Sequence, residues 1–230
     1  MSDAEIAALE AALRRRFRVV ESTVTVAGRS MTILHPASAE DLIDEDEFAR
    51  DERLPYWAEL WPSAKVLAEC VVRLDGAGRS LIELGCGSGL VATCASLAGF
   101  DVVASDYYED AIRFARANAW RNGAPVPRGL VLDWRELPAD AARYDVVVAS
   151  DVLYERTYGD LVARAIAAFL APGGFALIAD PGRVARDEFR RVLPSLGLEL
   201  RRREDVPFVE GAIRQTIAVL EIAWLAPRGP

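Results

Sequence analysis

Continuous apolar runs alternate with amphipathic stretches along the chain from about residue 80 onward. Runs such as Val146-Val147-Val148 are apolar at successive positions, which is typical of strands that a parallel sheet buries on both faces. The runs end in Asp or Gly, and helical stretches follow them. This pattern predicts seven strands, at Ser80–Leu84, Asp101–Ser105, Gly129–Leu132, Tyr144–Ala149, Phe175–Ala179, Leu198–Arg203 and Arg214–Trp224.

One helical stretch precedes the first of these strands, and four more lie between successive strands among the first six. They are expected near Ser63–Leu74, Gly89–Ala98, Glu109–Asn122, Tyr158–Leu170 and Arg183–Leu196. Alternating strands and helices predict a doubly wound, Rossmann-like α/β fold. The last two strands have no helix between them, so they are expected to form an antiparallel hairpin.

The first 53 residues follow another pattern, and we expect an N-terminal extension to a main domain at 54–230. Ser2–Arg16 is predicted to be a helix, because Ser2 and Glu5 have capping-box spacing and the apolar residues form one stripe. Two short strands are then expected, at Phe17–Val26 and Met31–Leu34.

The segment Glu40–Arg53 carries eight acidic residues and two arginines, which accounts for most of the chain's net charge of −8. Such a run is most often a solvated loop. The alternative is a lid or dock for a basic substrate surface. Because phosphate binding needs a basic surface, the net charge makes nucleic acid an unfavoured partner and a cationic substrate a favoured one.

Composition narrows the class of protein. Of the 230 residues, 52% are apolar and 27% charged, which excludes a disordered chain. No apolar run is long enough to span a membrane, and the polar N-terminus lacks a signal-peptide core, so we expect no membrane partner and a cytoplasmic location. The three cysteines have no zinc-site spacing, so no metal is expected. Lys65 is the only lysine beside 26 arginines, which suggests a GC-rich, bacterial genome.

A glycine-rich loop follows the first core strand and opens a helix. Glycines in Gly85-Cys-Gly87-Ser-Gly89 let the backbone approach a ligand closely, and the helix N-terminus offers free N–H donors. Asp106 ends the next strand 21 residues after Gly85, where a carboxylate can bridge two ribose hydroxyls. A dinucleotide fingerprint has its third glycine at the position of Leu90, so a diphosphate ligand is less favoured.

The segment Glu83-Leu-Gly-Cys-Gly-Ser-Gly89 resembles the first motif of class I S-adenosylmethionine-dependent methyltransferases. The resemblance covers roughly residues 54–224 and implies a seven-stranded sheet whose last strand is antiparallel. It also implies that Glu83, Gly85 and Gly87 line the methionine part of S-adenosylmethionine and that Asp106 holds the ribose. Gly89 is also predicted to bind the cofactor.

Three further features resemble the protein lysine methyltransferases that carry a DxxY motif. They are Trp57-Ala-Glu-Leu-Trp61-Pro before the first core strand, Asp133-Trp134 after the third, and Ser150-Asp151-Val-Leu-Tyr154 after the fourth. Asp180-Pro-Gly-Arg183 favours one branch, the electron-transfer-flavoprotein beta-subunit lysine methyltransferases and their bacterial relatives. The resemblance thus implies a protein substrate that presents a lysine.

The cofactor is expected to contact further side chains. Trp134 is placed to stack on adenine, and Asp133 either accepts from the adenine amino group or caps the next turn. Trp57 and Trp61 share one face if the segment is helical, and they either close over the sulfonium or clasp the N-terminal segment. Tyr107, which follows Asp106, and Ser150, which precedes Asp151, are also predicted to contact the cofactor.

Asp151 and Tyr154 are the candidates for catalysis. They lie just beyond the carboxyl end of a central strand, where α/β sheets bind ligands. Asp151 can bind and orient an ammonium group, and Tyr154 can accept from or donate to the nitrogen. Alternatively, Asp151 caps the strand and Tyr154 is a packing residue.

Competing functions remain open at this stage. A small-molecule N-methyltransferase would have the same motifs, and a non-catalytic scaffold could keep the fold and the cofactor. A nicotinamide-dependent oxidoreductase is disfavoured by Leu90. Outside the motifs, His35 is expected to be an exposed loop residue, and Asn118 and Asn122 are expected to stabilise the C-terminus of their helix.

Overall fold

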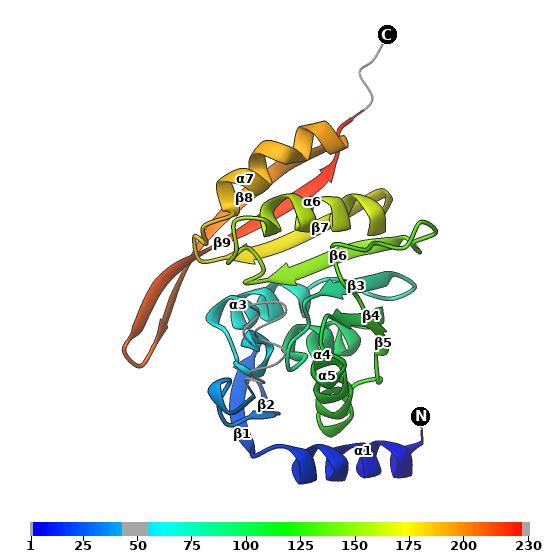
Figure 1. The fold of residues 1–230 in the computed structure, drawn as a ribbon, viewed down its shortest axis with the longest axis vertical. Helices are drawn as coiled ribbons and strands as arrows, with labels where there is room; N and C mark the ends of the chain where they lie inside the picture. Colours follow the sequence, from blue (N-terminus) through cyan, green and yellow to red (C-terminus); the bar gives the residue numbers. More distant parts are fainter. Residues whose placement is uncertain (1, 43–54, 227–230) are drawn as a thin grey trace.

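The computed structural model describes residues 2–42 and 55–226. Its core is a seven-stranded sheet in the order β5-β4-β3-β6-β7-β9-β8 (Figure 1). The strands are β3 (Ser80–Leu84), β4 (Asp101–Asp106), β5 (Arg128–Val131), β6 (Tyr144–Ser150), β7 (Leu170–Asp180), β8 (Leu198–Glu210) and β9 (Ile213–Trp224). All strands from β3 to β7 pair in parallel, and β9 runs antiparallel to both of its neighbours. The predicted fold is therefore confirmed.

Helices cover both faces of this sheet. One face carries α3 (Pro62–Val71), α4 (Leu90–Leu97) and α5 (Glu109–Arg121), and the other carries α6 (Tyr158–Phe169) and α7 (Arg186–Val192) (Figure 1). Neighbouring strand residues enter different cores: Val146 and Val148 pack with the first group of helices, and Val147 with the second. Burial on both faces explains why these strands are apolar at every position.

The C-terminal hairpin is longer than the pattern predicted. The apolar pattern of β8 stops near Arg203, yet the strand continues to Glu210. Only Ala218–Ala223 of β9 pairs with β7, so the rest of the hairpin extends beyond the sheet (Figure 1). The predicted helix Arg183–Leu196 is also shorter, because it begins only at Arg186 and ends in a 3₁₀ turn.

The N-terminal elements match the predicted helix and the two predicted strands, which pair as an antiparallel hairpin. α1 (Asp3–Arg16) has the capping box between Ser2 and Glu5, and β1 (Val19–Val26) pairs with β2 (Arg29–Pro36). Of the acidic segment, only its start is described, as a 3₁₀ turn at Glu40–Leu42. Residues 43–54 lie outside the described residues, and the two interpretations of this segment stay predictions. No described helix is long and apolar enough to cross a membrane.

The predictions for His35 and Asn118 were wrong, whereas that for Asn122 is confirmed. His35 lies in β2, half-buried, with its ring 2.8 Å from the hydroxyl of Ser22. Asn118 is fully buried and binds the backbone of Leu34 through both atoms of its amide, at 2.7 and 2.8 Å. Asn122 ends α5 as predicted, because its amide donates to the carbonyl of Asn118 at 2.8 Å, and the same amide also binds the backbone of Thr32. Both residues therefore attach the hairpin of β1 and β2 to α5.

Replacing Asn118 with Ala is expected to lower the free energy of unfolding by about 3 kcal/mol, because three hydrogen bonds are lost and buried backbone groups stay unsatisfied. The third of these bonds runs to the carbonyl of Ser88, at 2.8 Å. The matched variant, Asn122→Ala in a half-buried site, is expected to cost about 1 kcal/mol. Urea unfolding of both variants checks this, and equal losses would contradict the argument.

Candidate functional site

A cavity of about 500 Å³ opens at the carboxyl ends of β3, β4 and β6. This is the point where the strand order reverses around β3, which is the usual ligand site of an open α/β sheet. All twelve side chains and backbone positions that the sequence singled out line it. They are Trp61, Glu83, Gly85, Gly87, Gly89, Asp106, Tyr107, Asp133, Trp134, Ser150, Asp151 and Tyr154.

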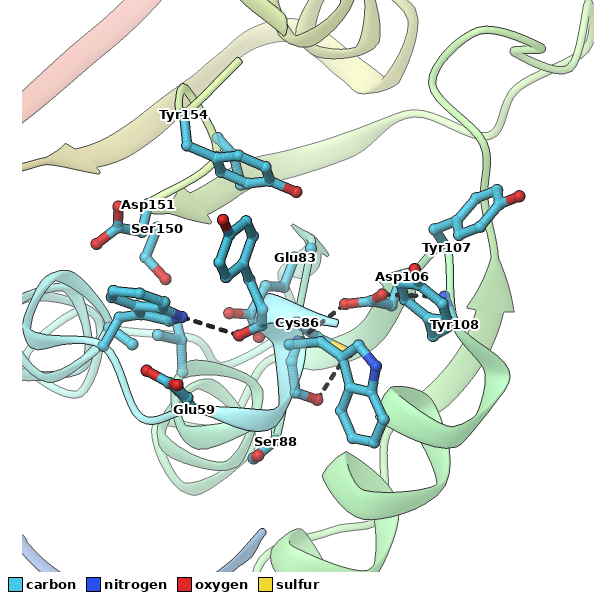
Figure 2. Close-up of a pocket in the computed structure, with 18 of the residues that line it drawn as sticks. Glu59, Glu83, Cys86, Ser88, Asp106, Tyr107, Tyr108, Ser150, Asp151 and Tyr154 are labelled. Carbon is cyan, nitrogen blue, oxygen red and sulfur yellow. Dashed lines mark hydrogen bonds between the residues drawn. The ribbon is translucent and has the colours of Figure 1, made fainter. Parts of the chain in front are cut away.

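Figure 2 shows how the two sides of this cavity differ. Asp106 and Tyr107 come from the end of β4, and Ser150, Asp151 and Tyr154 come from the end of β6 on the opposite side. Glu83, at the end of β3, lies between them. The cavity thus has one side near β4 and another near β6, with the glycine loop as its floor.

The glycine loop has the left-handed backbone that its sequence predicts. Gly85, Gly87 and Gly89 have φ angles of +72°, +50° and +80°. A side chain at Gly85 would meet the ring of Trp134 at 3.5 Å, and one at Gly87 would meet the carbonyl of Trp57 at 3.1 Å. The absent side chains therefore leave a cradle that a ligand can enter.

Asp106 is held on the side of the cavity near β4 by backbone donors. Its carboxylate accepts from the N–H of Gly87 and from the N–H of Tyr108, each at 3.0 Å. Burial nevertheless raises the pKa of Asp106 to about 6, although these backbone N–H groups act in the opposite direction. The side chain is therefore mostly ionised at neutral pH and mostly protonated at pH 5.

Glu83 is a buried carboxyl with an unsatisfied atom. Its exposure is 1%, and its Oε2 has no hydrogen-bond partner among the described residues. Burial, more than the nearby charge of Asp106, raises its pKa well above the usual range. A buried polar atom without a partner is rare and indicates that something else completes its hydrogen bonding.

The side of the cavity near β4 carries an aromatic ring and a capped turn. Trp134 is half-buried and packs edge-on against Tyr158, at 5.5 Å between ring centroids. Asp133 accepts from the backbone N–H of Arg135 at 2.9 Å and pairs with its guanidinium at 2.6 Å. The turn-capping alternative for Asp133 is thus present in the structure, and the carboxylate also lines the cavity.

Asp151 has an unusual backbone conformation. It is one of two described non-glycine residues with a positive φ, at +58°. Its N–H donates to the carbonyl of Ala179, and its carboxylate accepts from Nε of Arg183. Such conformations cost energy and gather at functional sites. Here this conformation places a nearly buried carboxylate, with 5% side-chain exposure, in the wall of the cavity.

Arg183 was not predicted as a site residue. Its guanidinium lies 5.1 Å from the ring centroid of Trp61, so it is enclosed between an aromatic face and the carboxylate of Asp151. The buried carboxylate of Asp180 holds the turn before it by accepting from the N–H groups of Gly182 and Arg183, at 2.8 and 3.1 Å. The motif Asp180-Pro-Gly-Arg183 was visible in the sequence, but only as a mark of relationship.

Further aromatic rings of the cavity pack against Tyr154 and Trp61. The indole N–H of Trp61 donates to the carbonyl of Tyr56 at 2.9 Å, and the ring of Tyr56 lies 5.2 Å from that of Tyr154. The ring centroid of Tyr158 lies 5.0 Å from that of Tyr154. Burial raises the pKa of Tyr154 well above its ordinary value, so Tyr154 stays a neutral phenol rather than a base. Tyr56 and Tyr158 are additions to the predicted site.

The expectation that Trp57 and Trp61 share a helical face was wrong. The helical turn is a short 3₁₀ segment, Tyr56–Ala58, and the chain is extended again at Glu59. The ring centroid of Trp57 therefore lies 5.7 Å from that of Phe114 in α5, as expected if Trp57 clasps the N-terminal segment. Trp57 also lines the cavity. Trp61 instead precedes α3 and faces Arg183.

Comparison with known proteins gives this cavity a context. A family profile described as "Methyltransferase domain" matches residues 55–226. The electron transfer flavoprotein beta subunit lysine methyltransferase of Danio rerio is 32% identical over 134 residues, which are 56% of this chain and 51% of that protein. The ubiquinone biosynthesis O-methyltransferase of Bordetella avium is 29% identical over 112 residues, which are 46% and 44%. The chain thus spans about half the length of these relatives.

Solved structures share the fold. Magnesium protoporphyrin IX methyltransferase from Synechocystis PCC 6803, crystallised with S-adenosylmethionine, has a TM-score of 0.55 at 19% identity. The similarity covers 69% of this chain and 77% of that one. At this identity the likeness concerns the arrangement of the sheet and helices.

Proposed function

This chain belongs to the methyltransferase domain family, whose fold is that of the S-adenosylmethionine-dependent enzymes, and from this premise we propose that it methylates a lysine side chain of a protein. The finer assignment to the electron-transfer-flavoprotein branch is part of the same proposal. It is supported by the Danio rerio relative and by the DxxY and Asp180-Pro-Gly-Arg183 motifs.

The residues of the cavity fit S-adenosylmethionine. Glu83 has an unpaired buried oxygen, and the cradle at Gly85 and Gly87 would be filled by any side chain. We assign the methionine part of the cofactor to these residues and to Gly89, the ribose to Asp106, and the adenine to the side of Trp134. Tyr107, Asp133, Ser150 and Trp61 complete the proposed contacts. When bound, S-adenosylmethionine supplies an electrophilic methyl group on a positively charged sulfur.

One observation carries the choice of a cationic acceptor. The corner formed by Asp151 and Trp61 already holds a cation, the guanidinium of Arg183, through a carboxylate and an aromatic face. These two groups are also the ones that bind a lysine ammonium. The ammonium of a protein lysine can therefore bind to the same carboxylate and the same aromatic face that now hold the guanidinium of Arg183.

The cavity residues address a specific energetic problem. A lysine amine has a reference pKa of about 10.4, so its neutral form costs about 4.6 kcal/mol at pH 7. Asp151 binds the ammonium and orients it, and the neutral phenol of Tyr154 can donate to or accept from the nitrogen. The proton then leaves to water. Alignment of the amine with the reacting carbon supplies a large part of the rate.

Other acceptors remain alternatives. A small-molecule amine would use the same corner, and the relative from Bordetella avium is named as an O-methyltransferase. A scaffold that only binds the cofactor would need no acceptor at all. The expectation that nucleic acid is not the acceptor rests on the net charge of −8 alone.

The experiment that tests the proposal uses purified protein and methyl-labelled S-adenosylmethionine. The mixture is incubated with the intact-protein fraction of a bacterial extract and, separately, with its small-molecule fraction. A labelled protein with label on lysine supports the proposal. Label confined to small molecules, or to another residue type, would overturn it in favour of the corresponding alternative.

The proposed ribose contact predicts a pH dependence of cofactor binding. The affinity for S-adenosylhomocysteine is expected to fall about tenfold from pH 7 to pH 5, because Asp106, with a pKa of about 6, loses the charge that makes it a strong acceptor. The sole histidine, His35, lies in β2 and does not line the cavity. Calorimetric titration measures the affinity, and Asp106→Asn should bind weakly at both values. A wild-type affinity that does not vary with pH would contradict the assignment.

A further inference from the structure

Arg183 occupies the corner of the cavity that the proposed function gives to the acceptor. Its Nε contacts the carboxylate of Asp151, and its guanidinium lies over Trp61. An ammonium that approaches Asp151 meets this guanidinium, and two cations beside one carboxylate repel each other. The acceptor and Arg183 therefore cannot both have the full benefit of Asp151.

The two ends of Arg183 differ in mobility. Its backbone is fixed, because its N–H donates to Asp180, a fully buried residue. Its side chain is one-third exposed and is held by one ion pair and one stacking contact. A long side chain on a fixed backbone can leave Asp151 without unfolding the loop.

Two further carboxylates line the cavity that Arg183 also lines. The carboxylates of Glu59 and Glu155 line the same cavity, and neither has an ion pair with any described residue. Glu59 is exposed and Glu155 is half-buried, so both can receive a cation at low cost in desolvation. Displacement of Arg183 therefore need not leave a bare charge in the cavity.

On the basis of the proposed function, we propose that Arg183 is a specificity-determining residue that competes with the acceptor for Asp151 and so excludes free amines. A small amine can contact this site only through its ammonium and short carbon chain, so nothing offsets the cost of displacing Arg183. A lysine on a protein brings further contacts outside the cavity, and these offset the cost of displacing Arg183. The side chain thus makes the site selective for an amine carried on a large partner.

Binding of n-butylammonium, which matches a lysine side chain without its protein, tests this competition directly. The measurement is made by calorimetry with saturating S-adenosylhomocysteine, so that the amine cannot enter the cofactor side of the cavity. Arg183→Gln, which keeps most of the length of the side chain but loses the charge, is expected to bind n-butylammonium at least about tenfold more tightly than the wild type. Arg183→Ala is expected to behave similarly.

The controls show whether Arg183 competes with the amine for Asp151 or merely supports the carboxylate of Asp151. Arg164→Ala removes an arginine that pairs with Asp160 on the surface of α6, and it should bind like the wild type. All variants should bind S-adenosylhomocysteine equally. Unchanged or weaker amine binding in Arg183→Gln would mean that Arg183 merely supports Asp151, and would overturn the inference. Absence of amine binding in every variant would overturn it as well.

This result is independent of the test of the proposed function. Lysine labelling in the extract, with no gain of amine affinity in Arg183→Gln, would remove the inference and leave lysine methylation in place. A gain of amine affinity, with label found only on oxygen or in small molecules, would remove the proposed function instead. In the first case Arg183 would have a role other than competition with the acceptor for Asp151.

Discussion

Replacing Asp151 with Asn is expected to slow methyl transfer by about two to three orders of magnitude and to leave the affinity for S-adenosylhomocysteine unchanged. The acceptor ammonium would then face a neutral amide, and truncating one partner of a hydrogen-bonded charge pair between two molecules costs about 2–5 kcal/mol, where a factor of ten corresponds to about 1.4 kcal/mol. Asn is nearly isosteric and tolerates the positive φ of this position, so the change removes the charge and little else.

The measurement is a rate of methyl transfer to the labelled protein, together with a calorimetric titration of S-adenosylhomocysteine. Asp160→Asn is the matched control, because Asp160 also pairs with an arginine but lies on the surface of α6. Wild-type transfer by Asp151→Asn would remove Asp151 from the proposed role. A parallel loss of cofactor affinity would move it to the cofactor side of the cavity.

The parts of this site that the sequence predicted are those set by local chain geometry. The glycine loop, its strand and its helix form one continuous segment, so three glycines and the carboxylate of Asp106 were enough to locate them. Asp151 and Ser150 were likewise found at the end of an apolar strand. A short motif next to a well-marked strand fixes both the position and the direction of its residues.

The parts that were missed depend on contacts between distant segments. The partner of Asp151 is Arg183, 32 residues away, and the partner of Asn118 is Leu34, 84 residues away. No local pattern encodes such a pair. The error for Trp57 and Trp61 has another cause, because a spacing of four residues places side chains on one face only in a continuous helix. Here the 3₁₀ turn ends at Ala58, and Glu59 and Trp61 are extended before Pro62 begins α3.

Gly89→Ala is expected to lower the free energy of unfolding by about 3–5 kcal/mol, a large share of the stability of an ordinary domain. A Cβ atom here would lie 2.3 Å from Cβ and 2.4 Å from Cα of Ala115 in α5, so two helices would have to move apart. The left-handed backbone, with φ of +80°, adds about 1–2 kcal/mol of strain for any other residue.

Gly28 separates these two contributions, because its φ is +78° but nothing lies within 4 Å of the position of its Cβ. Gly28→Ala is therefore expected to cost only the strain, about 1–2 kcal/mol. Urea unfolding of both variants gives the difference, and equal losses would show that α4 and α5 do not need this close approach. A larger loss at Gly89 would show that the third glycine of the loop, beside lining the cavity with its backbone, lets α5 pack against the start of α4.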